Sequence, residues 1–131
     1  MQDLLKRIEN KDFTVGVVGL GYVGLPLAVE FGNAGIRTIG IDVNQSRVDQ
    51  LNRGENYIQD VSDAELKTLV DAGTFTATTD FSSIKHIDAI CIAVPTPLSK
   101  TKDPDITYIL DVNKQLEKYV HKGLVVILES T

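Results

Sequence analysis

The chain has 131 residues, which is enough for one domain with a hydrophobic core. Hydrophobic residues make up 43% of the chain and charged residues 24%, which is ordinary for a soluble globular protein. The formal net charge is −5 and no stretch is basic, so neither nucleic acid nor an anionic membrane is an expected partner. No window approaches the ~18 apolar residues of a membrane span, and the polar segment 1–11 does not resemble a secretory signal. The single cysteine excludes an internal disulfide and favours a reducing, cytoplasmic location.

The first twelve residues are predicted to form a unit separate from the rest of the chain. Leu4, Leu5 and Ile8 recur at helical spacing, so residues 1–12 are predicted to form a short amphipathic helix. Residues 13–131 are predicted to form a single domain.

The most informative motif lies at residues 14–24. A β-branched, apolar strand over 14–18 runs directly into a Gly-x-Gly-x-x-Gly motif, and an apolar helix follows over 25–33. Gly19 permits the tight turn, Gly21 lets a pyrophosphate approach the backbone, and Gly24 lets the helix pack closely on the strand. The N–H groups and the positive end of this helix would face the phosphates. A dinucleotide-binding βαβ unit requires this order of elements.

Asp42 follows the second predicted strand, residues 36–41, and bears on the choice of cofactor. A carboxylate there can accept hydrogen bonds from the adenosine ribose and would repel a 2′-phosphate, which favours NAD over NADP. Asp42 could instead cap the helix predicted over 44–53, but Asn44 can do so itself and leave the acid free. Arg47 is a candidate contact to the adenosine side or a phosphate, and a solvated surface arginine is the alternative.

Pro26 conflicts with a helix that begins at Tyr22, because proline has no N–H and clashes with the carbonyl four residues back. Two solutions remain open. Either the regular helix starts later than Tyr22, or its first turn is distorted.

The rest of the chain alternates between helices and strands. Helices are predicted over 62–72, where Ser62 and Glu65 form a capping box, and over 105–120, with a turn or short helical connection over 80–86. Strands are predicted over 75–79, 87–94 and 124–128. We therefore expect an α/β fold with a Rossmann-like, doubly wound parallel sheet in the order 3-2-1-4-5, flanked by helices. Because a complete sheet needs at least one more strand, the domain is expected to be truncated and to belong to a longer protein.

Two threonines are expected at the carboxyl edge of this sheet, where ligands bind in open α/β folds. Thr96 lies between Pro95 and Pro97 in the loop after the fourth strand, and Thr131 follows the fifth strand. Either hydroxyl could contact a cofactor. The alternatives are a locally hydrogen-bonded Thr96 and a frayed Thr131.

Four ordered segments together resemble the UDP-glucose/GDP-mannose dehydrogenase family from about residue 13 onward. They are Gly-Leu-Gly-Tyr-Val-Gly-Leu-Pro at 19–26, Gly-Ile-Asp-Val-Asn at 40–44, Val-Pro-Thr-Pro-Leu at 94–98 and Glu-Ser-Thr at 129–131. The loop at 54–60 resembles the branch that acts on UDP-N-acetyl-hexosamines, such as the 6-dehydrogenases of UDP-N-acetylglucosamine and UDP-N-acetylmannosamine.

The resemblance implies an enzyme that oxidises the C6 alcohol of a UDP-sugar to a carboxylate with two NAD⁺, through a thiohemiacetal and a thioester on a cysteine. Such enzymes serve polysaccharide biosynthesis and are expected to be homodimers when full length. The resemblance assigns NAD contacts to the motif glycines and to Tyr22, Val23, Asp42, Arg47, Thr96 and Thr131. Thr96 could also be a catalytic auxiliary.

The catalytic residues implied by the resemblance are missing from this sequence. The nucleophilic cysteine and the UDP-binding domain would lie after Thr131, so the fragment is expected to bind NAD and to be inactive. Cys91 lies inside a predicted strand and is interpreted as a core residue, and His86 and His121 as surface residues. No cluster has metal-ligand spacing, so no metal site is predicted.

Two other functions remain open from the sequence. One is the NAD(P)-binding domain of a 6-phosphogluconate- or hydroxyacyl-type dehydrogenase, which shares the fold, although the loop at 95–97 disfavours it. The other is a non-enzymatic nucleotide-sensing module. The sequence leaves undecided which nucleotide sugar is bound, the oligomeric state of the fragment and whether the chain truly ends at Thr131.

Overall fold

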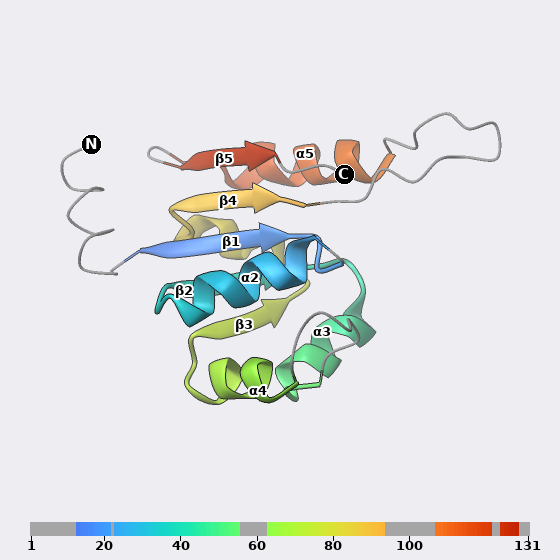
Figure 1. Ribbon diagram of the computed structural model, residues 1–131. Coiled ribbons are helices and arrows are strands. Elements are labelled where there is room, and N and C mark those ends of the chain that lie inside the picture. The colour runs from blue at the N-terminus through green and yellow to red at the C-terminus, as the bar shows by residue number, and fades with distance from the viewer. Residues whose placement is uncertain (1–12, 22, 56–62, 94–106, 122–123, 129–131) are drawn as a thin grey trace.

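A parallel β-sheet forms the centre of the protein. The computed structural model describes residues 13–21, 23–55, 63–93, 107–121 and 124–128. Within them, five strands pair side by side in the order β3-β2-β1-β4-β5, and all the pairings are parallel. The strands are β1 (Thr14–Val18), β2 (Arg37–Ile41), β3 (Phe75–Thr78), β4 (Ala89–Ile92) and β5 (Val125–Leu128) (Figure 1). The predicted strand order is confirmed.

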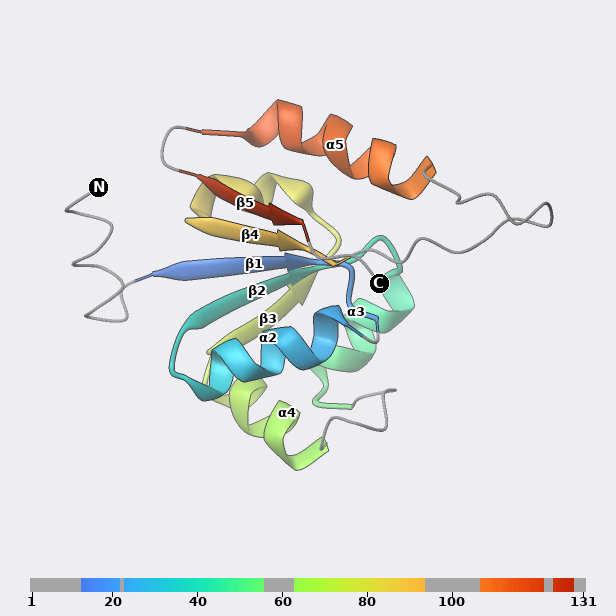
Figure 2. The same cartoon turned by 45° about the horizontal axis from the view of Figure 1, so that its top comes forward.

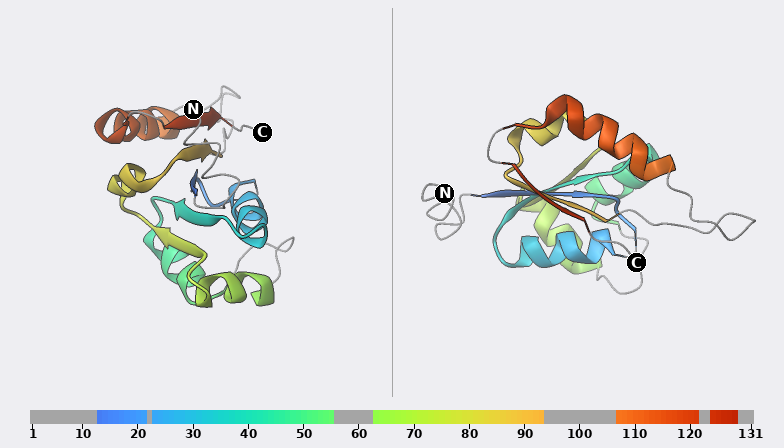
Figure 3. Two further views of the ribbon diagram at one scale, coloured as in Figure 1. Left: turned by 90° about the vertical axis from the view of Figure 1, so that its left-hand side faces the viewer. Right: turned by 90° about the horizontal axis from the view of Figure 1, so that it is seen from above.

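Helices cover both faces of this sheet, as a doubly wound fold requires. One face carries α2 (Gly24–Asn33) and α4 (Asp63–Asp71), and the other carries α5 (Thr107–Tyr119) and the 3-10 helix η1 (Phe81–His86) (Figure 3). In Figure 2, α5 lies alongside β4 and β5, whereas α3 (Gln45–Asn52) lies at the β3 end of the sheet.

The hydrophobic core has one part on each face, because alternate residues of a strand point to opposite sides. Val15 and Val17 of β1 pack with α2, α3 and α4, whereas Val18 packs with η1, β4 and α5. Gly16 of β1 lies against Ile87, and a Cβ at this glycine would come within 2.4 Å of the isoleucine Cδ1. Cys91 is buried in β4 and is 4% exposed, as predicted for a core residue.

The observed strands differ from the predicted ones at the β4 and β5 side of the sheet. Strand β4 begins at Ala89 rather than Ile87, because the Ile87 N–H donates to the carbonyl of Ile84 and thereby ends η1. Strand β5 is apolar, as predicted, but it is partly exposed. It has one described neighbour, and the exposed fractions of Val125, Val126 and Ile127 are 44%, 48% and 43%.

The predicted helix over 1–12 and the capping residue Ser62 lie outside the described residues. None of the described helices has the length and apolar character that crossing a membrane requires.

One side chain protects the outer edge of β3. The side-chain amide of Asn52, at the end of α3, donates to the carbonyl of Ala77 at 2.9 Å and accepts from the N–H of the same residue at 3.0 Å. The Thr74 carbonyl accepts from the N–H of Thr38 in β2, and the Thr78 carbonyl accepts from the N–H of Asp42 directly after β2. By the alternation of a strand, the Ala77 groups therefore face away from β2. Asn52 thus pairs with an edge on which no other strand lies among the described residues, and it fixes α3 to β3.

We predict that Asn52→Ala lowers the free energy of unfolding by about 1–3 kcal/mol, because two hydrogen bonds are lost. Asn52→Asp should lose at least as much, because one carboxylate oxygen still accepts from the Ala77 N–H while the other faces the Ala77 carbonyl, an acceptor against an acceptor. Urea denaturation followed by circular dichroism measures both values. An Asn52→Ala protein with the wild-type midpoint would contradict the role given to this side chain.

Candidate nucleotide site

The candidate site lies at the carboxyl edge of β1 and β2, where two chain segments far apart in sequence meet. The parallel register sets Val18 beside Ile41, and the N–H of Gly19 continues this ladder by donating to the Ile41 carbonyl at 2.8 Å. The glycine-rich turn after β1 and Asp42 after β2 are therefore held side by side. In open α/β sheets this edge is where ligands bind.

Each motif glycine occupies a position that suits its predicted role. Gly19 has φ +91°, a backbone conformation that residues with a side chain rarely adopt. A Cβ at Gly24 would lie 1.6 Å from the carbonyl oxygen of Gly19, so only glycine lets α2 pack this closely on the turn. A Cβ at Gly21 would meet no atom of the described residues within 4 Å, apart from its chain neighbours, so the described part of the chain leaves the space over this residue open.

The conflict at Pro26 is resolved by a late start of the helix. Helix α2 begins at Gly24 with Val23 as its N-cap residue, and this places Pro26 at the third helical position. The missing N–H of proline falls in the first turn of the helix, between the N–H of Leu25, which donates to the Gly21 carbonyl at 3.1 Å, and the N–H of Leu27, which donates to the Val23 carbonyl at 3.3 Å. The first of the two sequence-based solutions is therefore correct.

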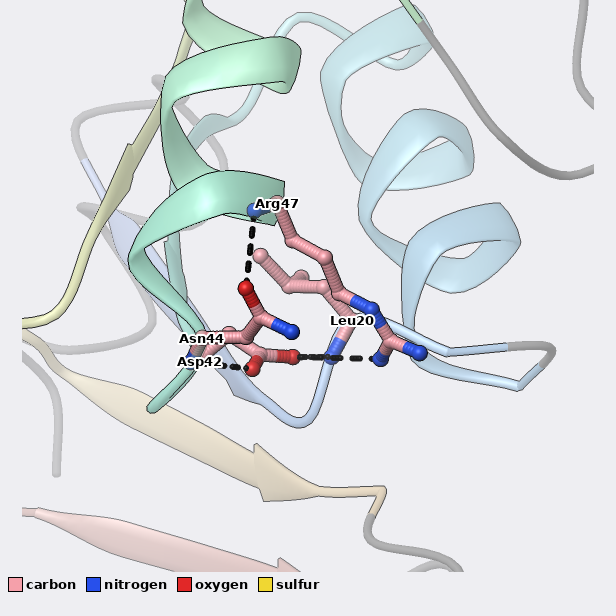
Figure 4. Close-up of polar contacts among 4 residues, drawn as sticks. All are labelled: Leu20, Asp42, Asn44 and Arg47. Carbon is pink, nitrogen blue, oxygen red and sulfur yellow. Dashed lines mark hydrogen bonds and ion pairs between the residues drawn. The ribbon is translucent and has the colours of Figure 1, made fainter.

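Asp42 is buried and its carboxylate is bound on both oxygens (Figure 4). Oδ2 accepts a hydrogen bond from the N–H of Leu20 at 2.9 Å, and Oδ1 accepts from the N–H of Asn44, also at 2.9 Å. The side chain of Asn44 caps α3 as predicted, because it accepts from the N–H of Arg47 at 3.1 Å. The expectation that this cap leaves Asp42 free is wrong, since the acid already binds two backbone N–H groups.

Arg47 reaches back over the carboxylate from the first turn of α3 (Figure 4). Its Nη1 atom lies 3.9 Å from Oδ2 of Asp42, and its side chain is 46% exposed, against 6% for the acid. The guanidinium is therefore an outer, solvent-facing partner of a buried charge. Arg47 is thus an exposed side chain that lies beside Asp42, and its contact with a coenzyme stays a prediction.

Sequence reasoning missed Leu20, the residue between the first two motif glycines. Its side chain is fully buried, and its N–H forms the bond to Asp42. A Cβ at Gly40 would lie 2.9 Å from both methyl carbons of Leu20, so this glycine makes room for the leucine. The available signal was a glycine inside a strand, which often marks a close approach of another group.

Polar groups extend the edge beyond β3. The hydroxyl of Thr79 lies 3.2 Å from Oε1 of Gln45 and links β3 to the start of α3. Asp80 caps η1 by accepting from the N–H of Ser82 at 2.9 Å. The pKa of Asp80 is lowered by its side-chain hydrogen bond to Ser82 and then by this backbone bond. The stabilisation from this cap is therefore present above the usual pKa of the carboxyl and is lost as the pH falls through the lowered value.

Three predicted site residues, Tyr22, Thr96 and Thr131, lie outside the described residues. Val23 is described, and its backbone carbonyl accepts from the N–H of Leu27 at 3.3 Å. Of the two histidines interpreted as surface residues, His86 is exposed, whereas His121 is half-buried with its Nε2 atom 2.8 Å from the Ile87 carbonyl.

Comparison with known proteins identifies the family. The sequence model of the UDP-glucose/GDP-mannose dehydrogenase family, NAD binding domain, matches residues 13–131. The chain belongs to this family. The match decides against the 6-phosphogluconate- and hydroxyacyl-type alternatives. Since relatives of the chain are named dehydrogenases, the family is one of oxidoreductases.

Several relatives are similar over most of this chain. The UDP-N-acetyl-D-glucosamine 6-dehydrogenase of Pseudomonas aeruginosa is 42% identical over 92% of the chain and 28% of its own length. The UDP-N-acetyl-D-mannosamine dehydrogenase of Escherichia coli K12 is 42% identical over 90% of the chain and 28% of its own length. The crystal structure of NDP-N-acetyl-D-galactosaminuronic acid dehydrogenase from Methanosarcina mazei superposes with a TM-score of 0.84 at 34% identity, covering 100% of this chain and 30% of that one. The chain thus spans under a third of the length of these relatives.

We predict that alanine destabilises the protein at one glycine of the family motif and leaves its stability unchanged at another. Gly24→Ala should lower the free energy of unfolding by about 1–3 kcal/mol or more, because the new methyl group meets the Gly19 carbonyl. Gly21→Ala should leave it nearly unchanged, because the methyl group enters open space. Thermal unfolding of both variants measures the difference, and equal melting temperatures would contradict the packing described for α2.

Proposed function

We propose that this chain binds NAD at the carboxyl edge of β1 and β2, as the coenzyme domain of an NAD-dependent UDP-sugar 6-dehydrogenase. The observation that carries the proposal is the space over Gly21, which the described residues leave open beside a turn closed tightly by Gly19 and Gly24. A pyrophosphate needs such a place, where no side chain stands between it and the backbone. The residues present therefore fit the coenzyme.

In this proposal the residues of the motif hold the pyrophosphate. The backbones of Tyr22 and Val23 would contact it, and the N-terminus of α2 would face it with its positive end. Pro26, as the third residue of α2, offers no N–H, so the donors come from the turn that precedes it.

The carboxylate of Asp42 would accept hydrogen bonds from the hydroxyls of the adenosine ribose. A carboxylate has about four acceptor positions. The N–H groups of Leu20 and Asn44 occupy one on each oxygen, so each oxygen keeps one for a ribose hydroxyl. A 2′-phosphate would bring a second negative charge against this buried acid, which supports a preference for NAD over NADP.

The proposed reaction follows from family membership and from the chemistry of a primary alcohol. NAD⁺ supplies a two-electron hydride acceptor, and oxidation of a C6 alcohol to a carboxylate removes four electrons, so two NAD⁺ are consumed. UDP-N-acetyl-hexosamines are the proposed substrates, because relatives at 42% identity are named for such sugars. The catalytic cysteine and the sugar site would lie in the remainder of a longer protein, which would act as a homodimer. Thr96 and Thr131 are proposed contacts near the reacting end of NAD.

Titration calorimetry with NAD⁺ and NADP⁺ tests the proposal. We expect the chain to bind NAD⁺ and to bind NADP⁺ at least about tenfold more weakly. Gly21→Ala should weaken NAD⁺ binding by about tenfold or more, because its methyl group takes the space of the pyrophosphate. Asp42→Ala should weaken it by a similar factor, because charge-assisted hydrogen bonds are lost.

Asp49→Ala is a suitable control for these titrations. Asp49 lies on the exposed side of α3, where its carboxylate accepts from the side chain of Gln45. The substitution Asp49→Ala should therefore leave the affinity for NAD⁺ unchanged. If the folded wild-type chain bound neither coenzyme, the proposed function would be wrong. Equal affinity for both coenzymes would contradict the role of Asp42 alone.

A further inference from the structure

We infer that Asp42 is also a positioning residue: its carboxylate holds the glycine-rich turn in the shape that receives the phosphates, before any nucleotide arrives. The inference rests on the proposed function, because it concerns the same site. It goes further by giving the acid a second task that no ribose contact requires.

The hydrogen bond from the Leu20 N–H to Asp42 Oδ2 carries this inference. It joins residues 22 positions apart in the sequence, and the bond itself is buried. Leu20 lies between Gly19 and Gly21, so the bond fixes the backbone at the point where the phosphates would approach. The other oxygen is bound to the N–H of Asn44, which orients the carboxylate toward Leu20.

An asparagine at position 42 would have the same shape and could not do both tasks. Its amide has one oxygen that accepts and one nitrogen that only donates. Whichever way the amide turns, either the Leu20 N–H or the Asn44 N–H faces another donor. Because the Asn44 bond is local and close to the start of α3, we expect the amide to keep it and to release the turn.

Because Asp42 is charged, its positioning role can be distinguished by experiment from a role as a ribose contact only. The acid repels phosphates and partly neutralises Arg47, whose guanidinium lies 3.9 Å away. If Asp42 only contacts ribose, Asp42→Asn lowers the affinity for adenosine, and it lowers the affinity for ADP less, because the repulsion between the acid and the phosphates has gone. If Asp42 also shapes the turn, the affinity for ADP falls more than the affinity for adenosine, because only ADP uses the turn. The two accounts predict opposite signs.

The experiment compares wild type, Asp42→Asn and the control Asp49→Asn in two measurements. Nuclear magnetic resonance titrations give the affinities for ADP and for adenosine, and amide hydrogen exchange without ligand reports on the turn. For Asp42→Asn we expect the ratio of ADP to adenosine affinity to fall about tenfold. We also expect faster exchange at Leu20 with unchanged protection in residues 14–18 of β1. Asp49→Asn should match wild type in both measurements.

Other outcomes would overturn the inference. An ADP-to-adenosine ratio that stays constant or rises, with Leu20 exchange as in wild type, would leave Asp42 as a ribose contact only. If Asp42→Asn does not fold, Asp42→Ser is measured in the same way, since the smaller side chain lets water reach the Leu20 N–H. Loss of protection throughout β1 in both variants would mean that the acid holds the sheet rather than the turn. If wild type bound neither ligand, the proposed function would fail, and the exchange measurement alone would decide the positioning role.

Discussion

The structure depends most on how the end of β1 is tied to the end of β2. The N–H of Gly19 binds the Ile41 carbonyl, and the next N–H, that of Leu20, binds the Asp42 carboxylate. The first bond continues the sheet, and the second ends it with a side chain in place of a strand carbonyl. The last backbone hydrogen bond between the two strands is therefore followed directly by a hydrogen bond to a charged side chain, at the edge where a nucleotide is proposed to bind.

Close packing supports this connection from both sides. On one side, α2 reaches the turn because Gly24 has no side chain to hold it away from the Gly19 carbonyl. On the other, the buried side chain of Leu20 fits over Gly40 of β2. Interiors are packed as densely as crystals, so the turn has little freedom to change shape alone. The open space over Gly21 contrasts with these contacts, and the contrast is what makes the edge suitable for a ligand.

The sequence predicted the fold and the type of site well, because both depend on local patterns. Alternating apolar strands and helices indicated a parallel sheet, and the spacing of three glycines indicated where its turn lies. The state of Asp42 could not be predicted in the same way. Its bond to Leu20 depends on the register between β1 and β2, which the composition of neither strand reveals.

Helix α3 is attached to the rest of the domain at each of its ends. At its start, Gln45 contacts Thr79 and Asn44 caps the turn that carries Arg47; at its finish, Asn52 pairs with Ala77. Because this short helix is attached at both ends, a displacement of β3 would move the whole helix, including Arg47. Substitutions along the outer strand β3 would therefore shift Arg47 relative to Asp42 without replacing any residue of the candidate site, which gives protein engineers a remote means of adjusting nucleotide recognition.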